Sequence, residues 1–467
     1  MSEAVSQAPT AAGPRASARR LIAPLALAQF ICSFAGSNMN VMISDITNDL
    51  DTTVKGVQTT ITLFLVIMAV LMIPCSKLTD RWGRKRCFML GLTLYGIGAL
   101  LSAVSPGLGV LILGNSIFEG VGTALLIPPV YILATLWFED MTSRAWAFGV
   151  ISGLGGIGAA AGPLIGGVIT SAISWRAAFV FQALIVATIV LLSRRLVDPL
   201  PADPKRPFDA VGAVLSAVGL FFIVFGILQA GTNNLLFAAL LTVGVVFLAA
   251  FFLYIRRRER AGKEPLLSTR LFRNRTCNLA LVTQNIQWLL LLGSSFVISV
   301  YLQEVRGYSA VKTGVIFTAA TAGILVSSLA AERLAKRYAQ RTLIITGFVV
   351  TLAGILVLIF LVGAWDSLAA FVPGLLLIGL GLGGMLTPSV NVVQSSFPEQ
   401  LQGEISGLSR SVSNLGSSLG TAIAGTILVS DLASGRHAYA IAMGTLAAIG
   451  LAGLVAALRL PRTIARA

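Results

Sequence analysis

Residues 57–105 read VQTTITLFLVIMAVLMIPCSKLTDRWGRKRCFMLGLTLYGIGALLSAVS, and this stretch decides the fold. Two apolar runs, 57–76 and 87–105, flank the short basic segment Lys77–Arg86. Each run is close to the roughly 20 residues that an α-helix needs to cross the hydrocarbon core of a bilayer. The stretch therefore predicts two membrane-spanning helices joined by a tight, charged turn.

The same pattern continues along the whole chain, in which 56% of the 467 residues are hydrophobic and 11% are charged. Fourteen apolar runs follow one another with only short polar breaks. A water-soluble domain buries one hydrophobic core and has no use for so many uninterrupted runs. We therefore predict an all-α membrane protein with fourteen transmembrane helices.

The basic residues predict the orientation of these helices. With a cytoplasmic N-terminus, 29 of the 34 lysines and arginines fall in the tails, the even-numbered loops or the cytoplasmic parts of the spans. Cytoplasmic loops of membrane proteins carry such an excess. We therefore expect both termini to be cytoplasmic and the protein to span the inner (plasma) membrane of a bacterium. The basic residues outside this pattern are Lys55, Arg176, Arg306, Lys312 and Arg436.

The net charge of +15 does not indicate a nucleic-acid partner, because these basic residues flank helix ends, where anionic lipid head groups lie. We find no phosphate-cradling loop, and His437 is the only histidine. We predict no cofactor, no metal site and no catalytic activity, so that an ion gradient must supply any energy. The four cysteines lack the spacing of metal ligands: Cys32, Cys75, Cys87 and Cys277.

The chain also repeats itself weakly. A shift of about 256 to 259 residues aligns Ser76–Arg86 with Glu332–Arg341 and Gly158 with Gly416. Chance recurrence is the alternative in a chain this rich in glycine. The shared shift predicts two six-helix halves with two inserted central helices, and such halves are typical of rocking transporters. The predicted segments are an N-terminal tail (1–20), a first half (21–196), a linker with the inserted helices (197–256), a basic cytoplasmic loop (257–276), a second half (277–458) and a C-terminal tail (459–467).

The basic segment between the second and third runs predicts a gate. Asp80 lies among cationic side chains beside Gly83, so charge-assisted hydrogen bonds can latch neighbouring helix ends together. An ordinary positively charged cytoplasmic loop is the alternative. The other residues of the predicted cytoplasmic gate are Arg81, Arg84, Lys85 and Arg86.

This segment resembles the loop 2–3 motif of the major facilitator superfamily, G-x-L-a-D-R-x-G-R-K-R, with Ser76 in place of the first glycine. Together with the repeat, the resemblance covers almost the whole chain and implies a transporter. In the second half Lys336 stands at the position of Asp80, so any latch there must be wired differently.

A second motif lies in the fifth run. Glycines four residues apart let another helix approach closely, and the proline permits a kink. Helix packing alone is the simpler explanation of these residues. The run also resembles the antiporter motif of superfamily exporters, which implies transport out of the cell. Its residues are Gly158, Gly162, Pro163, Gly166 and Gly167.

With fourteen runs, the chain is similar to one branch of the superfamily, the fourteen-helix drug:proton antiporters. It departs from that branch at two polar positions, where Ala35 replaces an aspartate in the first span and Ser116 replaces an arginine in the fourth. Glu119 stands nearby, in place of a glutamine, roughly 13 Å along the fourth span. A carboxylate at that depth must pair, hydrate or take up a proton, so we predict that Glu119 is the proton-coupling residue. A structural hydrogen-bonding role is the alternative.

Polar and aromatic side chains within other spans are candidates for a substrate cavity between the halves. Hydrogen bonding between helices is the ordinary alternative for each of them. The candidates are Asn38, Asn40, Gln284, Gln287, Trp288, Asn391, Arg410 and Asn414.

These observations and the resemblance predict a monomeric secondary transporter that exports amphipathic small molecules in exchange for protons. Its expected partners are the substrate, protons and membrane lipid. A lipid or metabolite exporter, or an uncoupled facilitator of the same fold, is the first alternative because the two customary polar residues are missing. A membrane receptor or scaffold without transport is the second, and the lack of a sizeable soluble domain argues against it.

Overall fold

A computed structural model describes residues 14–138, 141–194, 196–199, 201–205, 207–230, 233–335, 337–365, 367–397, 402–429 and 435–461. The regular elements in these ranges are helices. Most of the two predicted tails and Lys336 lie outside them. The longer helices are α1 (Pro14–Asn38), α3 (Val54–Trp82), α4 (Arg84–Ala103), α6 (Gly120–Trp137), α7 (Met141–Ala172), α8 (Trp175–Ser193), α9 (Ala210–Ile227), α10 (Asn234–Arg260), α11 (Arg275–Val300), α12 (Ala310–Ala335), α13 (Gln340–Ala364), α14 (Phe371–Gln394), α15 (Gln402–Val429) and α16 (Gly435–Leu458).

Short elements connect or extend these helices. The π-helical segment η2 joins α5 to α6, so that Leu108–Trp137 forms one continuous helical stretch, and the π-helical segment η4 extends α11 to Val305. A π-helical turn holds one extra residue and often occurs at functional sites. The short elements are η1 (Met39–Val41), α2 (Ile43–Asp49), α5 (Leu108–Leu111), η2 (Ile112–Glu119), η3 (Thr269–Arg273), η4 (Tyr301–Val305) and η5 (Leu368–Ala370).

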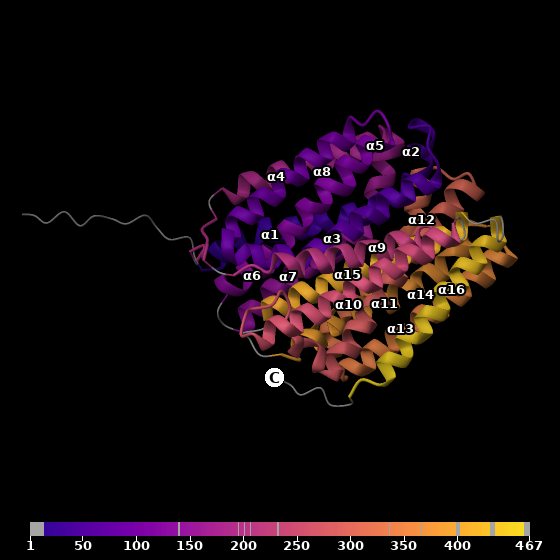
Figure 1. Cartoon of the computed structure of the whole chain (residues 1–467). Coiled ribbons are helices and arrows are strands. Elements are labelled where there is room, and N and C mark those ends of the chain that lie inside the picture. The colour runs from indigo at the N-terminus through magenta and orange to yellow at the C-terminus, as the bar shows by residue number, and fades with distance from the viewer. Residues whose placement is uncertain are drawn as a thin grey trace, which may run out of the picture.

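The helices form two groups that lie side by side, α1–α8 and α11–α16 (Figure 1). In the first group, α1 packs along α7, and α4 packs against α6 and α8. In the second, α14 packs against α12 and α13, and α11 packs against α15 and α16. The groups meet along two helix pairs, α3 with α15 and α7 with α12. These two seams frame the space between the groups.

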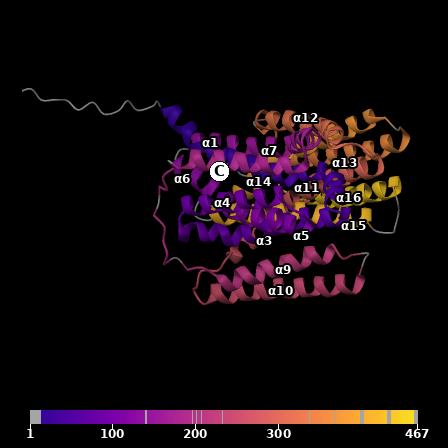
Figure 2. The same cartoon turned by 90° about the horizontal axis from the view of Figure 1, so that it is seen from above.

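Helices α9 and α10 form a separate pair outside the two groups (Figure 2). α9 packs on α3 and α15 through a small apolar cluster that includes Val66, Val224 and Ala422. Few residues of α10 are buried, and its apolar side chains face outward. An apolar, exposed helix of this kind is suited to contact with lipid.

Twelve described helices are long and apolar enough to cross a membrane. α7 makes a thirteenth if its two parts, which are bent by 44° between Gly149–Ala159 and Ala161–Ala172, form one span. Pro163 explains the bend, because it cannot donate a hydrogen bond to the carbonyl four residues earlier. The predicted count of fourteen is therefore not confirmed by length and composition.

The remaining predicted span coincides with α15, which is 28 residues long. This helix lies between α3 and α11 in the interior and carries a series of buried hydroxyl groups. Such groups are tolerated in a helix that faces other helices or a cavity. The buried hydroxyl residues are Ser409, Ser411, Ser413, Ser417, Ser418 and Thr421.

Candidate transport site

A cavity lies between the two helix groups. Side chains from α1, α3, α6 and α7 line it on one side, and side chains from α11 and α15 on the other. The apolar lining residues include Phe64, Leu65, Met68, Met72, Ile127 and Leu292, and the lining residues with polar groups include Gln29, Ser33, Ser37, Trp288, Arg410, Ser413, Asn414 and Ser417.

Arg410 links the two groups at this cavity. Its guanidinium carbon lies 4.6 Å from the centre of the Tyr131 ring, and its Nη2 donates a hydrogen bond to the Tyr131 hydroxyl. The Tyr131 hydroxyl in turn donates to Gln29 Oε1 at 3.2 Å. Three helices, α15, α6 and α1, are therefore joined through one polar chain at the edge of the cavity.

The predicted cavity residues fall into three sets. Trp288, Arg410 and Asn414 line the cavity. Gln284 and Gln287 are buried beside it and bond to neighbouring helices: Gln284 accepts from the Ser409 hydroxyl and donates to that of Ser413, both at 2.9 Å, and Gln287 donates to the Leu382 carbonyl at 3.4 Å. The last set lies away from the lining and comprises Asn38, Asn40 and Asn391.

In this last set, Asn391 is exposed on α14. Asn38 is fully buried at the end of α1, and its side-chain amide has no hydrogen-bond partner among the described residues. Asn40 lies in η1, where its Nδ2 donates to Ser295 Oγ at 3.2 Å. Its position places it in a contact between the two groups rather than on the cavity wall.

That contact closes one end of the bundle, here called the closed end. Gln303 Nε2 donates to the Asn40 carbonyl at 2.7 Å, and Gln303 Oε1 accepts from the Ser44 amide at 3.2 Å. On the α7–α12 seam, the Val311 amide donates to Ser171 Oγ at 3.0 Å. These bonds join the groups directly beyond the cavity.

Glu119 ends the π-helical segment η2, and its side chain is fully buried. Asn115 Nδ2 donates to Glu119 Oε2 at 3.3 Å, and the hydroxyls of Tyr95 and Ser102 on α4 lie close to the same carboxyl group. α4 can approach this closely because a Cβ at Gly98 would lie only 2.8 Å from the Glu119 backbone nitrogen. Glu119 is not one of the described residues that line the cavity.

The opposite end of the bundle carries the α3–α4 turn and is here called the basic end. Gly83, with φ of +94°, separates the two helices, in a conformation that L-residues with side chains rarely adopt. Arg84 Nη2 bonds to Asp80 Oδ1 at 2.8 Å across the turn. Asp198, from the proline-rich linker after α8, accepts the backbone amides of Arg84 at 2.6 Å and of Lys85 at 3.3 Å. A carboxylate at a helix N-terminus offsets the unpaired amides there.

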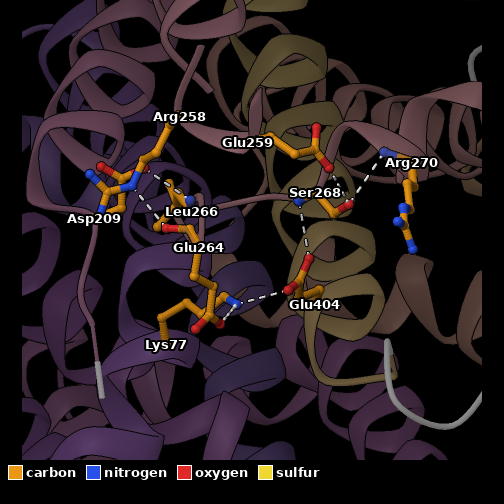
Figure 3. A network of polar contacts seen from close by, with 9 residues as sticks. All are labelled: Lys77, Asp209, Arg258, Glu259, Glu264, Leu266, Ser268, Arg270 and Glu404. Atoms are coloured by element: carbon orange, nitrogen blue, oxygen red, sulfur yellow. Dashed lines mark hydrogen bonds and ion pairs between the residues drawn. The ribbon is translucent and has the colours of Figure 1, made fainter. Parts of the chain in front are cut away.

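Lys77, one turn before Asp80, makes the ion pair that joins the two groups at the basic end. Its Nζ lies 2.8 Å from Glu404 Oε1 on α15 and 3.1 Å from Glu264 Oε1 in the loop after α10. Glu404 Oε2 also accepts the Ser268 amide of that loop at 3.1 Å. Figure 3 shows Lys77 at the foot of this network, between the two carboxylates.

The same loop is anchored to α9 and α10. Asp209, at the start of α9, accepts the Leu266 amide at 3.0 Å and lies 3.7 Å from Arg258 Nε. Glu259 accepts hydrogen bonds from the hydroxyls of Ser268 and Thr269. Figure 3 shows Glu259 beside Ser268. The loop is therefore held from both sides.

The glycine motif of α7 allows close packing on α1 and α12. A Cβ at Gly158 would lie 2.3 Å from the Phe30 carbonyl oxygen, and one at Gly162 would lie 2.0 Å from Ser37 Oγ. A Cβ at Gly167 would lie 2.5 Å from the Ala310 carbonyl of α12, and Gly166 lies against Asn38. The motif therefore packs α7 on α1 within its own group and on α12 of the other group.

Sequence reasoning missed several residues of the site. Gln29 carries a detectable signal, since it is an amide within an apolar run. Tyr131 carries none, because a tyrosine in a membrane helix has many ordinary uses. Glu264 and Glu404 lie 187 and 327 residues from Lys77, so that nothing in the local sequence connects them to it.

Comparison with known proteins places this architecture among transporters. Residues 25–421 match the family model described as Major Facilitator Superfamily. The chain is 31% identical over 409 residues to the puromycin resistance protein pur8 of Streptomyces alboniger, covering 86% of this chain and 80% of that protein. It is 30% identical over 368 residues to the multidrug efflux pump LfrA of Mycolicibacterium smegmatis, covering 78% and 72%.

Other comparisons agree. The tetracenomycin C resistance and export protein of Streptomyces glaucescens is 28% identical over 393 residues, with 82% of this chain and 71% of that protein covered. A crystal structure of a POT family transporter in complex with a thioalcohol-conjugated peptide superposes with a TM-score of 0.71 at 16% identity, covering 94% of this chain and 96% of that one. The resemblance to multidrug exporters that the motifs predicted is confirmed by the sequence matches, and the structural match supports the fold alone.

Proposed function

Because the chain belongs to the major facilitator superfamily, we propose that it is a secondary transporter that exports amphipathic drugs or related organic compounds in exchange for protons. Relatives named for drug resistance and efflux support the direction of transport. The observation that carries the proposal is the cavity between the two helix groups, which both apolar and polar side chains line.

In this proposal the two helix groups are the halves of a rocking transporter. α7 and α15 also cross the membrane, which makes fourteen spans, and α9 and α10 are the inserted pair. The basic end faces the cytoplasm of a bacterial cell, in keeping with the excess of lysine and arginine in its loops. The closed end then faces outward, and cargo enters the cavity from the inside once the ion pair at the basic end has opened.

Opening and closing are assigned to the contacts at the two ends. At the outer side the groups separate when the bonds between η1 and η4 break. At the cytoplasmic side the gate comprises Asp80, Arg84 and their neighbours in the turn, together with the ion pair of Lys77 and Glu404. The α7 glycines provide the surface on which α7 and α12 move, because small residues let helix backbones slide at close range.

Glu119 is the proposed proton carrier. It is a fully buried carboxyl group within a span, and in such a place a charge is costly unless it is paired, hydrated or protonated. Asn115 stabilises the ionised form, while the surrounding protein favours the neutral one. Its place behind the cavity wall lets it respond to changes in helix packing without touching cargo.

The test is proton movement in proteoliposomes that contain the purified protein and a pH-sensitive dye. In the wild type, adding the drug should cause protons to move across the liposome membrane. Glu119→Gln should abolish this proton movement while drug binding persists. Asp45→Asn, which alters an exposed carboxylate on α2, is the matched control and should behave as the wild type. Transport that continues in Glu119→Gln with unchanged proton flux would remove Glu119 from the mechanism. Wild-type transport that is indifferent to the pH gradient would favour the uncoupled facilitator.

A further inference from the structure

We propose that the cavity selects cargo that carries a negative charge, such as a carboxylate or an ionised phenol on a flat apolar body, and that Arg410 recognises this charge. The proposal rests on the proposed transport function and names the chemical class of its substrate.

The first argument is the charge of the wall. Arg410 is the only Asp, Glu, Lys, Arg or His among the 17 described residues that line the cavity. The remaining polar groups there are amides, hydroxyls, an indole and a thiol. The described lining therefore carries one cationic group and no carboxylate.

The second argument is that Arg410 has no carboxylate partner in the part of the chain that the structure describes. Among the described residues its polar contact is the neutral Tyr131, through the hydroxyl and the face of the ring. The side chain is only partly buried, so its guanidinium group is open to the cavity. A cation within a membrane bundle is costly without a counter-charge, and an anionic cargo would supply one.

The third argument is geometry. A guanidinium group has five N–H donors in a planar fork, and Tyr131 engages one nitrogen, Nη2. The remaining donors suit the two oxygens of a carboxylate, which form short, charge-assisted bonds. Asn414 and Ser413 lie on the same helix within one turn of Arg410 and also line the cavity.

The rest of the cavity suits the body of such a molecule. Phe64, Met68 and Met72 on α3 form an apolar wall, with Trp288 of α11 also lining the space. Aromatic rings and flexible thioethers accommodate flat apolar ligands of varied outline. A cationic ligand of the same shape would gain these contacts but would be repelled by Arg410.

The experiment compares two dyes that share the xanthene ring system, anionic fluorescein and cationic tetramethylrosamine. Binding to the full-length protein in nanodiscs is measured by fluorescence anisotropy for the wild type, Arg410→Gln and Arg410→Lys. We expect the wild type to bind fluorescein at least about tenfold more tightly than the cation, in line with the strength of charge-assisted bonds. Arg410→Gln should lose about tenfold or more for fluorescein only, and Arg410→Lys, which keeps the charge but not the planar fork, should lose less than Arg410→Gln.

Equal or tighter binding of the cation by the wild type would overturn the proposal, whether or not the variants fold. A loss in Arg410→Gln that is the same for both dyes would also overturn it, since this would indicate a structural role. Dye flux driven by a pH gradient is measured separately in proteoliposomes. Selective anion binding without flux would leave the inference standing and would refute the proposed export function.

Discussion

Replacing Lys77 with glutamine should open the basic end of the protein. Lys77 lies between Glu404 on α15, at 2.8 Å, and Glu264 in the loop after α10, at 3.1 Å. The side chains of Lys77 and Glu404 are 16% and 17% exposed, whereas that of Glu264 is 38% exposed. The pair with Glu404 is therefore the less screened of the two, and it is the one that joins the helix groups.

The expected magnitude follows from these distances. Two unit charges about 3 Å apart attract by about 5 kcal/mol at an effective dielectric constant of about 20. Loss of hydration and of side-chain freedom offsets most of this attraction, which leaves about 1–2 kcal/mol for a partly buried pair. Because that range corresponds to a factor of about 5 to 30, Lys77→Gln should shift the equilibrium toward the open basic end by this factor.

Alkylation of a native cysteine measures the shift. Cys32 lines the cavity, and the other three cysteines can be replaced by alanine, so that a maleimide applied to the purified protein reports access to the cavity. The alkylation rate in Lys77→Gln should exceed that of the matched parent by about 5- to 30-fold. Lys77→Arg, which retains the positive charge, should stay near the parent.

A charge swap gives the decisive control. Lys77→Glu and Glu404→Lys should each raise the alkylation rate of Cys32, and the two changes combined should bring it back toward that of the parent. Rates within twofold of the parent for both Lys77→Gln and Glu404→Gln would refute the reasoning. A double variant as open as either single variant would show that the ion pair itself is not what holds the end closed.

Two further predictions concern packing and capping. Gly158→Ala should lower the free energy of unfolding by about 1–3 kcal/mol, and with it the apparent melting temperature in detergent, because its Cβ would lie 2.3 Å from a carbonyl oxygen of α1. Gly156→Ala is the control and should have little effect, because no atom lies within 4 Å of its Cβ. Equal effects of the two variants would contradict this. Asp198→Ala should cost about 1 kcal/mol, because it removes the acceptor of two amides at the start of α4. Asp203→Ala in the same linker is its control, and indistinguishable melting curves would count against the capping role.

Much of the fold could be predicted from the sequence, because membrane helices follow from the length of apolar runs. The stretch from Val57 to Ser105 correctly predicted α3 and α4 with a tight turn between them. α15 coincides with one of the fourteen predicted runs, although it is not among the twelve described helices that are long and apolar enough to cross a membrane. Its Ser413, Asn414 and Ser417 line the cavity between the helix groups.

The candidate site was less predictable, because helical spacing shows which residues share a face but not what that face meets. Trp288 and Gln287 are neighbours on α11, yet Trp288 lines the cavity and Gln287 bonds to α14. Asn40 belongs to the contact at the closed end for the same reason: its partners, Ser295 and Gln303, lie about 255 residues or more away in the chain. Only the packing of the two helix groups decides such pairings.

The loop between α10 and α11 gives the inserted helix pair a mechanical role. Glu264 and Ser268 bind the two residues of the ion pair at the basic end, while Asp209 and Arg258 fasten the same loop to the base of α9 and α10. The α9–α10 pair is therefore connected through this loop to both helix groups, at Lys77 on α3 and Glu404 on α15. Excising the pair would also remove the contacts through which this loop holds Lys77 and Glu404.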